Sequence, residues 1–318
     1  MLSVLVLSFL SLSIATRLDD FVEFIKVHNK IYHTKDLFDR RFNIFVDNMK
    51  YAEQINQLQS NYTLGMSPFA DLTEKEFSNY HLKTIELSRK CSPFNYEGLS
   101  TPESLDWREK NKVTNVKDQG QCGSCWSFSA SGAMEGAWSI SENDLVSISE
   151  QQLVDCSSNF EYGNHGCNGG LMDGAFNYAI KNGMCTEEDY SYDGKQGDCK
   201  SCNPVVKISN CKDVSPNNQL ELREAVSLGP VSVAIEADTR TFQLYTSGVI
   251  TGDACGTNLD HGVLVVGYGE ESGIPYWLVK NSWGPSWGES GYVKIERSDS
   301  ANDPGVCGIA MQPSFPLV

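Results

Sequence analysis

The sequence predicts a two-lobed α+β protein preceded by a separate helical segment. In the first hundred residues, apolar side chains recur every three or four positions among charged ones, which is typical of amphipathic helices. A further helical stretch begins near Cys125, whereas the chain beyond about residue 203 contains short apolar runs typical of strands. After the N-terminal segment, a helical first half followed by a β-rich second half implies two lobes with a cleft between them.

The elements follow from local patterns. The apolar positions of the N-terminal helices are Phe21, Phe24, Ile25, Phe38, Phe42, Ile44, Phe45 and Met49. Residues 87–102 lack periodicity and contain Ser, Pro and Gly, which predicts a linker that a protease can reach. Ser149 is the predicted N-cap of a short helix that reaches Cys156. Strands are predicted at 231–235, 262–266, 276–280 and 291–295.

Composition and net charge argue against some classes of function. The 318 residues are 40% hydrophobic and 21% charged, which is ordinary for a globular protein and more than one typical domain. The formal net charge is −16 and the pI is about 4.7. Proteins that bind nucleic acids contact phosphates through basic patches, so this charge argues against a nucleic acid partner.

The first 15 residues form an apolar run that ends in the small-x-small pattern Ser13-Ile14-Ala15. This run predicts a secretory signal peptide, although it lacks the usual basic residue near its start. It is too short for a transmembrane helix, and no other run is long and apolar enough to span a bilayer. We therefore expect a soluble mature protein in a compartment oxidising enough for disulfides.

Cys125 is the candidate nucleophile. It lies in the run QGQCGSCWSFSA, residues 119–130, directly before Trp126 and a helical stretch at 127–135. A thiol at the first residue of a helix faces unpaired backbone N–H groups and the positive end of the helix dipole. Both favour the thiolate, which is the nucleophilic form.

A thiolate that cleaves peptides needs an imidazole, a group that orients the imidazole, and donors for the oxyanion. His261 precedes the apolar run 263–266, Asn281 lies in KNSWG at 280–284, and Gln119 precedes Cys125 by a short loop. Gln119 is expected to form an oxyanion hole with the backbone N–H of Cys125. Taken singly, each residue also fits a purely structural role: Cys125 as half of a disulfide, His261 as a structural residue, and Asn281 as part of a turn. Their order and spacing together favour a catalytic set.

The run Cys122-Gly123-Ser124-Cys125-Trp126 fits the signature C-G-[SA]-C-[WY] at each position. That signature is accompanied by His and Asn roughly 130–150 residues downstream. His261 falls within that range and Asn281 lies slightly beyond it. On these residues the chain resembles the papain family of cysteine proteases, most closely its cathepsin L-like branch, over nearly everything after the first fifteen or so residues. The resemblance implies a papain-like fold, with a helical left lobe and a β-barrel-like right lobe, preceded by a helical inhibitory propeptide.

The resemblance divides the chain into a signal peptide at 1–15, an inhibitory propeptide at 16–100 and a papain-like peptidase domain at 101–318, with cleavage near Ser100. The family's interspersed propeptide motif is matched at Arg41, Phe45, Asn48 and Asn56 and departs at Leu37 and Ala52. A second motif, Gly65-x-Ser67-x-Phe69-x-Asp71, departs at Ser67. Protonation of carboxylates such as Asp71 is expected to loosen the propeptide at acidic pH.

Eleven cysteines is an odd number, as expected if one is a nucleophile. The resemblance implies the disulfides Cys122–Cys167, Cys156–Cys199 and Cys255–Cys307. Cys91, Cys185, Cys202 and Cys211 remain unassigned. Because Cys91 lies in the segment to be removed, at least one of the other three is expected to be unpaired or bonded elsewhere. The spacing of Cys199 and Cys202 also fits a metal site, but a secreted disulfide framework is favoured, and no metal or cofactor is expected.

Substrate contacts are expected beside Cys125. Gly169 and Gly170 allow close approach of an extended substrate backbone, although paired glycines also occur in ordinary tight turns. By resemblance, the pocket for the side chain two residues before the scissile bond is lined by Leu171, Met172, Ala234, Leu259 and Gly262, with Gln312 at its floor. Trp283 also belongs to the implied substrate-binding set. Apolar walls favour Leu, Val or Phe, and a Gln floor tolerates a basic side chain.

The resemblance thus implies a cysteine endopeptidase that acts through a Cys125 thiolate and His261 and is made as a secreted zymogen activated at acidic pH. Its implied partners are peptide and protein substrates, its own propeptide as an intramolecular inhibitor, and cystatin-type inhibitors. We expect a monomer in a lysosome-like acidic compartment or outside the cell.

Two other classes of function are weighed. A catalytically silent binding protein of this fold would lack the cysteine or the histidine, and both are present. Carboxydipeptidase relatives carry a long His-bearing loop between the cysteines that match Cys156 and Cys167, where this chain has a short segment with His165. Aminopeptidase relatives keep a propeptide remnant through a disulfide. Cys91 is a candidate donor for such a bond, but its partner would fall at Gln312.

Overall fold

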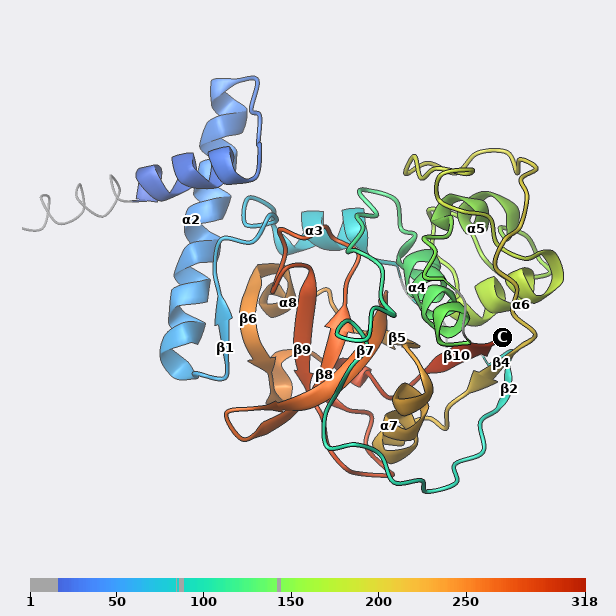
Figure 1. The fold of residues 1–318 in the computed structure, drawn as a ribbon. Helices are drawn as coiled ribbons and strands as arrows, with labels where there is room; N and C mark the ends of the chain where they lie inside the picture. Colours follow the sequence, from blue (N-terminus) through green and yellow to red (C-terminus); the bar gives the residue numbers. More distant parts are fainter. Residues whose placement is uncertain (1–16, 84, 86–88, 142–143) are drawn as a thin grey trace, which may run out of the picture.

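The computed structural model describes residues 17–83, 85, 89–141 and 144–318, so the predicted signal peptide lies outside the described residues. Figure 1 shows three parts side by side. The N-terminal helices lie next to β1 and β6, the sheet occupies the centre, and α4, α5 and α6 lie on the opposite side. The predicted combination of a helical part and a β-rich part is confirmed.

After a first helix over residues 17–27, the helices are α2 (Lys35–Leu58), α3 (Glu74–His81), α4 (Cys125–Ile140), α5 (Glu150–Cys156), α6 (Met172–Asn182), α7 (Gln219–Leu228) and α8 (Arg240–Leu244). The strands are β1 (Tyr62–Leu64), β2 (Ser92–Pro93), β3 (Leu105–Asp106), β4 (Asn210–Asp213), β5 (Val231–Ile235), β6 (Tyr245–Ile250), β7 (His261–Glu271), β8 (Ile274–Lys280), β9 (Tyr292–Glu296) and β10 (Ser314–Leu317). The four predicted strands correspond to β5, β7, β8 and β9, and β7 extends further than predicted.

The N-terminal helices form a unit around aromatic side chains. Phe21 of the first helix is fully buried, and its ring centre lies 5.1 Å from that of Phe45 in α2 and 5.9 Å from that of Phe24. Thr34 caps α2 by accepting the N–H of Leu37 at 3.2 Å. The three-to-four-residue spacing thus places the aromatic rings on facing sides of two helices.

The sheet has the order β1-β6-β9-β8-β7-β5-β10-β4-β2, with β3 paired to β7. Strands β5, β7, β8 and β9 pair antiparallel, and in this register His261 at the start of β7 lies opposite Ile235 at the end of β5. The two outer strands, β1 and β2, both come from residues before 101. The segment ahead of the predicted peptidase domain therefore covers both edges of its sheet.

Helix α4 is buried on nearly all sides, between β7 and the helices α5 and α6. Its small residues allow this close packing. A Cβ added to Gly132 would lie 2.7 Å from Leu264 Cδ2, and one added to Gly136 would lie 2.6 Å from Pro230 Cγ. These distances are shorter than carbon contacts allow, so the two glycines set how closely α4 approaches the sheet.

Five disulfides cross-link the chain. The bridges implied by the resemblance are present: Cys122–Cys167, Cys156–Cys199 and Cys255–Cys307. The remaining pairs are Cys91–Cys211 and Cys185–Cys202, so neither Cys199 nor Cys202 offers a thiolate to a metal. Cys211 is bonded outside the predicted peptidase domain. Among the described residues, which include all eleven cysteines, Cys125 is the one free cysteine.

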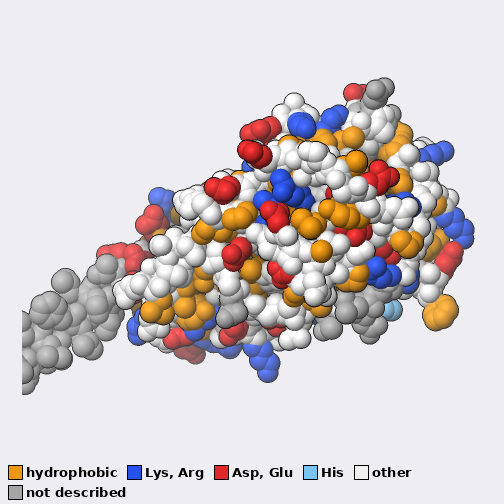
Figure 2. Space-filling model, turned by 90° about the horizontal axis from the view of Figure 1, so that it is seen from below, with side chains coloured by type: hydrophobic (Ala, Val, Ile, Leu, Met, Phe, Trp, Pro, Cys, Tyr) orange, Lys and Arg blue, Asp and Glu red, His pale blue; other side chains and the backbone are white. Residues whose placement is uncertain are grey.

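The surface mixes charges of both signs. On the face seen in Figure 2, acidic and basic side chains are interspersed and hydrophobic side chains occur in small groups. Within the described parts of the chain, no helix combines the length and the apolar character that crossing a bilayer requires.

Replacement of Phe45 by Ala is expected to lower the free energy of unfolding of the N-terminal unit by about 3–5 kcal/mol, because it opens a cavity among buried rings. Asn43→Ala, on an exposed position of the same helix, is the control and is expected to change little. Hydrogen exchange of the α2 amides measures the difference. Equal protection of α2 in the two variants would contradict this packing.

Candidate active site

Cys125 is the first residue of α4, as predicted. The N-cap residue is Ser124, whose hydroxyl lies 2.7 Å from the Tyr192 hydroxyl. The preceding loop is fixed by the Cys122–Cys167 disulfide and by the Gly123 N–H, which donates to the Cys167 carbonyl at 3.0 Å. These contacts hold the thiol at the positive end of the helix dipole.

Gly262 brings β7 against the start of α4. A Cβ placed on Gly262 would lie 3.2 Å from the backbone nitrogen of Trp126 and 3.3 Å from the carbonyl carbon of Cys125. A larger residue would have to push the strand and the helix apart. The absence of a side chain at Gly262 thus keeps the neighbouring His261 on the wall that faces Cys125.

Asn281 orients the His261 ring. Its Oδ1 accepts the backbone N–H of Ser282 at 2.8 Å, which identifies this atom as the amide oxygen, and it lies 2.7 Å from His261 Nε2. Because an amide oxygen only accepts, Nε2 carries the hydrogen of this bond. In the neutral ring, Nδ1 is then the basic nitrogen. This is the tautomer that an imidazole paired with a thiol through Nδ1 requires.

Trp283 covers the same histidine. Its ring stacks on that of His261 with centres 4.5 Å apart and an angle of 24° between the planes. Phe69 and Phe77, from the segment before residue 101, meet the Trp283 ring edge-on at 5.6 Å and 5.2 Å. The indole therefore shields the ring and its bond to Asn281 from water, and it is also where the N-terminal segment docks.

Gln119 is fully buried and tied to both lobes. Its Oε1 accepts the Ser282 hydroxyl at 2.7 Å, and its Nε2 donates to the Cys122 carbonyl at 3.0 Å. The Gln119 backbone N–H also donates to the Ser282 carbonyl at 2.9 Å. With its oxygen engaged by Ser282, the amide turns its nitrogen toward the loop before Cys125, which is the orientation that an oxyanion donor there needs.

The N-terminal segment covers the cleft above these residues. The backbone N–H groups of Lys83 and Ile85 donate to the carbonyls of Asp260 (3.1 Å) and Leu259 (2.9 Å) on one wall. On the other wall, a Cβ added to Gly169 would meet Lys83 Cβ at 3.1 Å. The segment therefore crosses from one wall to the other.

Burial raises the pKa of the Cys125 thiol to about 11, although backbone N–H groups, including that of Trp126, act in the opposite direction. The side chain is 2% exposed in this covered state. The covered thiol is accordingly protonated at neutral pH. Opening the cleft removes part of the desolvation, which leaves the helix terminus and the N–H donors to favour the thiolate.

The predicted pocket residues fall into three groups. Leu171, Met172, Ala234 and Leu259 belong to one buried apolar cluster, which Ile85 also joins. Gly170 lies against the Trp126 ring, Gly169 against Lys83, and Gln312 is buried beside Met311, which packs on the same cluster. Trp283 lies in a second buried apolar cluster and stacks on His261.

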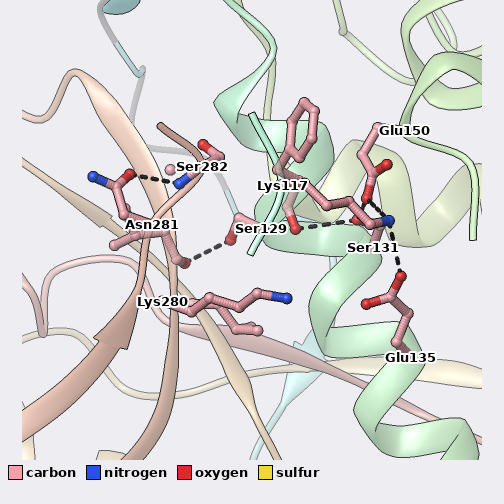
Figure 3. A pocket seen from close by; sticks show the side chains of 12 residues that line it. Lys117, Ser129, Ser131, Glu135, Glu150, Lys280, Asn281 and Ser282 are labelled. Carbon is pink, nitrogen blue, oxygen red and sulfur yellow. Dashed lines mark hydrogen bonds and ion pairs between the residues drawn. The ribbon is translucent and has the colours of Figure 1, made fainter. Parts of the chain in front are cut away.

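A buried cluster of charged side chains, Lys117, Glu135 and Glu150, lies at α4 (Figure 3). Lys117 Nζ bonds Glu150 Oε1 at 2.7 Å and Glu135 Oε1 at 3.1 Å, and Ser131 donates to Glu150. Lys280, the residue before Asn281, reaches the Thr114 hydroxyl at 3.0 Å, which in turn donates to Glu135. The cluster thus links the helix that starts at Cys125 to the strand that ends before Asn281.

The pKa values follow from this arrangement. Burial lowers the pKa of Lys117, but attraction to Glu135 and Glu150 outweighs burial and raises it. Burial raises the pKa of Glu150 despite the neighbouring ammonium group. The sequence analysis did not predict this cluster. It also did not predict that Ser282 positions the side chains of Gln119 and Asn281. A usable signal was Lys280, a charged residue at the end of an otherwise apolar strand.

We expect Lys117→Met to lower the free energy of unfolding by about 3–5 kcal/mol at pH 7.5, because two buried carboxylates lose the cation that is bonded directly to them. The loss is expected to shrink at pH 4.5, since the raised pKa of Glu150 favours its neutral form as the pH falls. Urea denaturation in a Cys125→Ala background measures both values. Lys181→Met, which breaks an exposed pair with Glu161, is the control and is expected to cost under about 1 kcal/mol. A pH-independent loss for Lys117→Met would refute the assignment.

Comparisons with known proteins agree with this geometry. Residues 101–317 match the papain family cysteine protease family, and residues 21–77 match the cathepsin propeptide inhibitor domain (I29). The chain is 48% identical over 288 residues to cysteine proteinase RD21A of Arabidopsis thaliana, covering 88% of this chain and 61% of that protein. It is 45% identical over 307 residues to thiol protease SEN102 of Hemerocallis sp., covering 92% of this chain and 84% of that protein.

Solved structures of precursors have the same fold. The recombinant stem bromelain precursor superposes with a TM-score of 0.88 at 37% identity, over 95% of this chain and 99% of that one. Digestive procathepsin L 3 of Tenebrio molitor larval midgut gives 0.85 at 38% identity, over 95% and 99%. The family match over residues 101–317, together with these relatives, confirms the resemblance: the chain belongs to the papain family of cysteine proteases.

Proposed function

We propose that this chain is the zymogen of a cysteine endopeptidase, in which Cys125, His261, Asn281 and Gln119 form the catalytic set. Residues 16–100 are its inhibitory propeptide and residues 101–318 its peptidase domain. The observation that carries the proposal is the tautomer of His261, which the amide oxygen of Asn281 fixes on the wall opposite a helix-terminal thiol.

In this mechanism His261 accepts the Cys125 proton at Nδ1, and the thiolate attacks the scissile carbonyl carbon. The carbonyl oxygen, now negative, is stabilised by the backbone N–H of Cys125 and the side-chain N–H of Gln119. His261 protonates the departing amine, which leaves a thioester on Cys125. Water then loses a proton to His261 and attacks the thioester, which releases the acid and regenerates the thiol.

The closed cleft supports synthesis as a zymogen. The N-terminal segment places Lys83 across the two walls and Ile85 in the apolar cluster that contains the predicted pocket. Substrates with Leu, Val or Phe two residues before the scissile bond suit the same apolar walls, with Gln312 tolerating a basic side chain. The proposal extends to secretion, a lysosome-like acidic compartment or the extracellular space, a monomeric enzyme, and inhibition by cystatin-type proteins.

Cys125→Ala and His261→Ala are each expected to abolish peptide hydrolysis by the activated protein, because one lacks the nucleophile and the other the proton carrier. Asn281→Ala is expected to keep measurable activity, since it orients the ring without reacting. Steady-state kcat/KM with a fluorogenic Phe-Arg peptide measures all three. Near wild-type hydrolysis by Cys125→Ala would overturn the mechanism.

Ion pairs of the N-terminal segment support the proposal of activation at acidic pH. Glu76 of α3 binds Arg40 and Arg41 of α2 at 2.8 Å each, and Thr73 caps α3 in a box with Glu76. Burial raises the Glu76 pKa, but the Thr73 N–H and Arg41 outweigh burial and lower it. Its stabilising contribution is therefore present above the ordinary pKa of a glutamate and is lost as the pH falls through the lowered one. Asp71 similarly binds Lys30 and the Tyr32 hydroxyl.

Glu76→Gln is expected to mature several-fold faster than wild type at pH 5, where the wild-type carboxylate is still charged. The difference between the two rates is expected to shrink as the pH falls toward 3, because protonation makes the wild-type side chain neutral as well. Asp39→Asn, which removes an exposed pair with Lys35 on the same helix α2, is the control. Gel analysis of processing over time measures the rates. A Glu76→Gln advantage that stays constant between pH 5 and pH 3 would exclude titration of Glu76 as a trigger.

A further inference from the structure

The disulfide Cys91–Cys211 crosses the proposed boundary between propeptide and peptidase domain. Cys91 lies before the predicted cleavage near Ser100, and Cys211 lies in β4 of the peptidase domain. Residues 89–99, here called the strap, run from β2 along the edge of the molecule past α7 (Figure 1). Cleavage near Ser100 alone leaves the strap, and everything before it, covalently attached.

The strap is built into the peptidase sheet. Strand β2 pairs parallel with β4, with Ser92 opposite Lys212, and the Phe94 N–H donates to the Asp213 carbonyl at 2.8 Å. The Phe94 ring meets that of Phe315 in β10 edge-on, with centres 5.2 Å apart. The strap therefore forms the outer strand of a sheet whose other members at this edge all come from the peptidase domain.

Two acidic side chains of the peptidase domain bind consecutive amides of the strap. Asp173 accepts the Lys90 N–H at 2.9 Å, and Asp213 accepts the Cys91 N–H at 3.1 Å. Both carboxyl groups are buried, and burial together with the neighbouring Asp173 raises the pKa of Asp213. Without the strap, this close pair of buried carboxyl groups would lose its N–H donors, which is unfavourable.

The C-terminal part of the strap binds a further helix. The N–H groups of Glu97 and Leu99 donate to the two carboxylate oxygens of Glu224 in α7, at 3.1 Å and 2.9 Å. At the other end, Lys90 Nζ donates to the Tyr162 carbonyl at 3.0 Å. All these partners lie in residues 101–318.

We propose that the strap is a lasting part of the mature enzyme, so that release of the inhibitory helices requires a second cut on the N-terminal side of Cys91. This inference rests on the proposed function, because it concerns the product of zymogen processing. After a single cut near Ser100, the disulfide holds the inhibitory helices at a high effective concentration over the cleft. The linker cut by itself therefore leaves the cleft occupied.

The position of the strap gives it a role in the mature enzyme. Asp173, which it binds, lies in the first turn of α6, and Leu171 and Met172 at the start of that helix line the proposed substrate pocket. Asn177 in the same helix donates to the Lys90 carbonyl at 3.4 Å. The strap thus supports one wall of the pocket from behind.

The test compares wild type with Cys91→Ser/Cys211→Ser and, as a matched control, Cys185→Ser/Cys202→Ser, whose bridge lies wholly within the peptidase domain. Each protein is matured at acidic pH without a reductant, alkylated, and measured by intact mass and N-terminal sequencing before and after reduction. In wild type and the control, we expect a Cys91-containing segment that either separates only on reduction or forms the start of the mature chain. In the Cys91→Ser/Cys211→Ser protein, we expect any segment cut from the peptidase to be lost before reduction.

A wild-type peptidase that begins after Cys91 and carries no attached segment before reduction would overturn the proposal. A failure of the proposed function gives a different result, namely no processing of any protein. For that case a Cys125→Ala zymogen is cut with pepsin next to the exposed linker residues Tyr96 and Leu99, and the same masses are measured. Retention of the Cys91 segment after this cut supports the strap, and its loss refutes it, whether or not the chain is a protease.

Discussion

The close packing of β7 on the start of α4 is the constraint on which the site depends. Gly262 touches the backbone of Cys125 and Trp126, and Gly132 lets Leu264 approach the middle of the same helix. This contact joins α4 to the sheet, and it brings the residue next to His261 against the backbone of Cys125. The buried ion pairs around Lys117 and the hydroxyl of Ser282 then fix the positions of the two walls relative to each other.

The same burial changes the chemistry of Cys125. A thiol at a helix terminus is predisposed to ionise, but burial raises the pKa of the Cys125 thiol to about 11. The covered thiol is therefore protonated as well as inaccessible. The N-terminal segment also packs Phe69 and Phe77 on Trp283, the ring that stacks on His261. Trp283 thus contacts both His261 and the N-terminal segment.

The sequence predicted features that depend on neighbouring residues, but not contacts between residues distant in the chain. Helix starts and strand positions depend on local pattern, and these predictions agree with the structure. The catalytic set of Cys125, His261 and Asn281 also came from local pattern and spacing, and it stays a prediction. The Cys91–Cys211 bridge, the Asp173–Asp213 pair and the Lys117 cluster join residues distant in sequence through side chains that carry no periodic signal. Cysteine counting showed that four positions were unassigned, but eleven cysteines allow too many pairings to choose among. The tautomer of His261 likewise became visible only through the distances around Asn281.

The two edges of the sheet differ, and the Cys91–Cys211 disulfide lies at the β4 edge. At the β6 edge, side chains from residues after 101 already bind the edge strand: Glu289 accepts the Gly248 N–H at 2.8 Å and is itself paired with Lys294. Charged groups of this kind protect an uncovered edge from pairing with other chains. At the β4 edge, the buried carboxyl groups of Asp173 and Asp213 take their donors from the strap. Strand β2 has two residues, too few to hold by ladder hydrogen bonds alone, and the Cys91–Cys211 bond adds a covalent attachment at this edge.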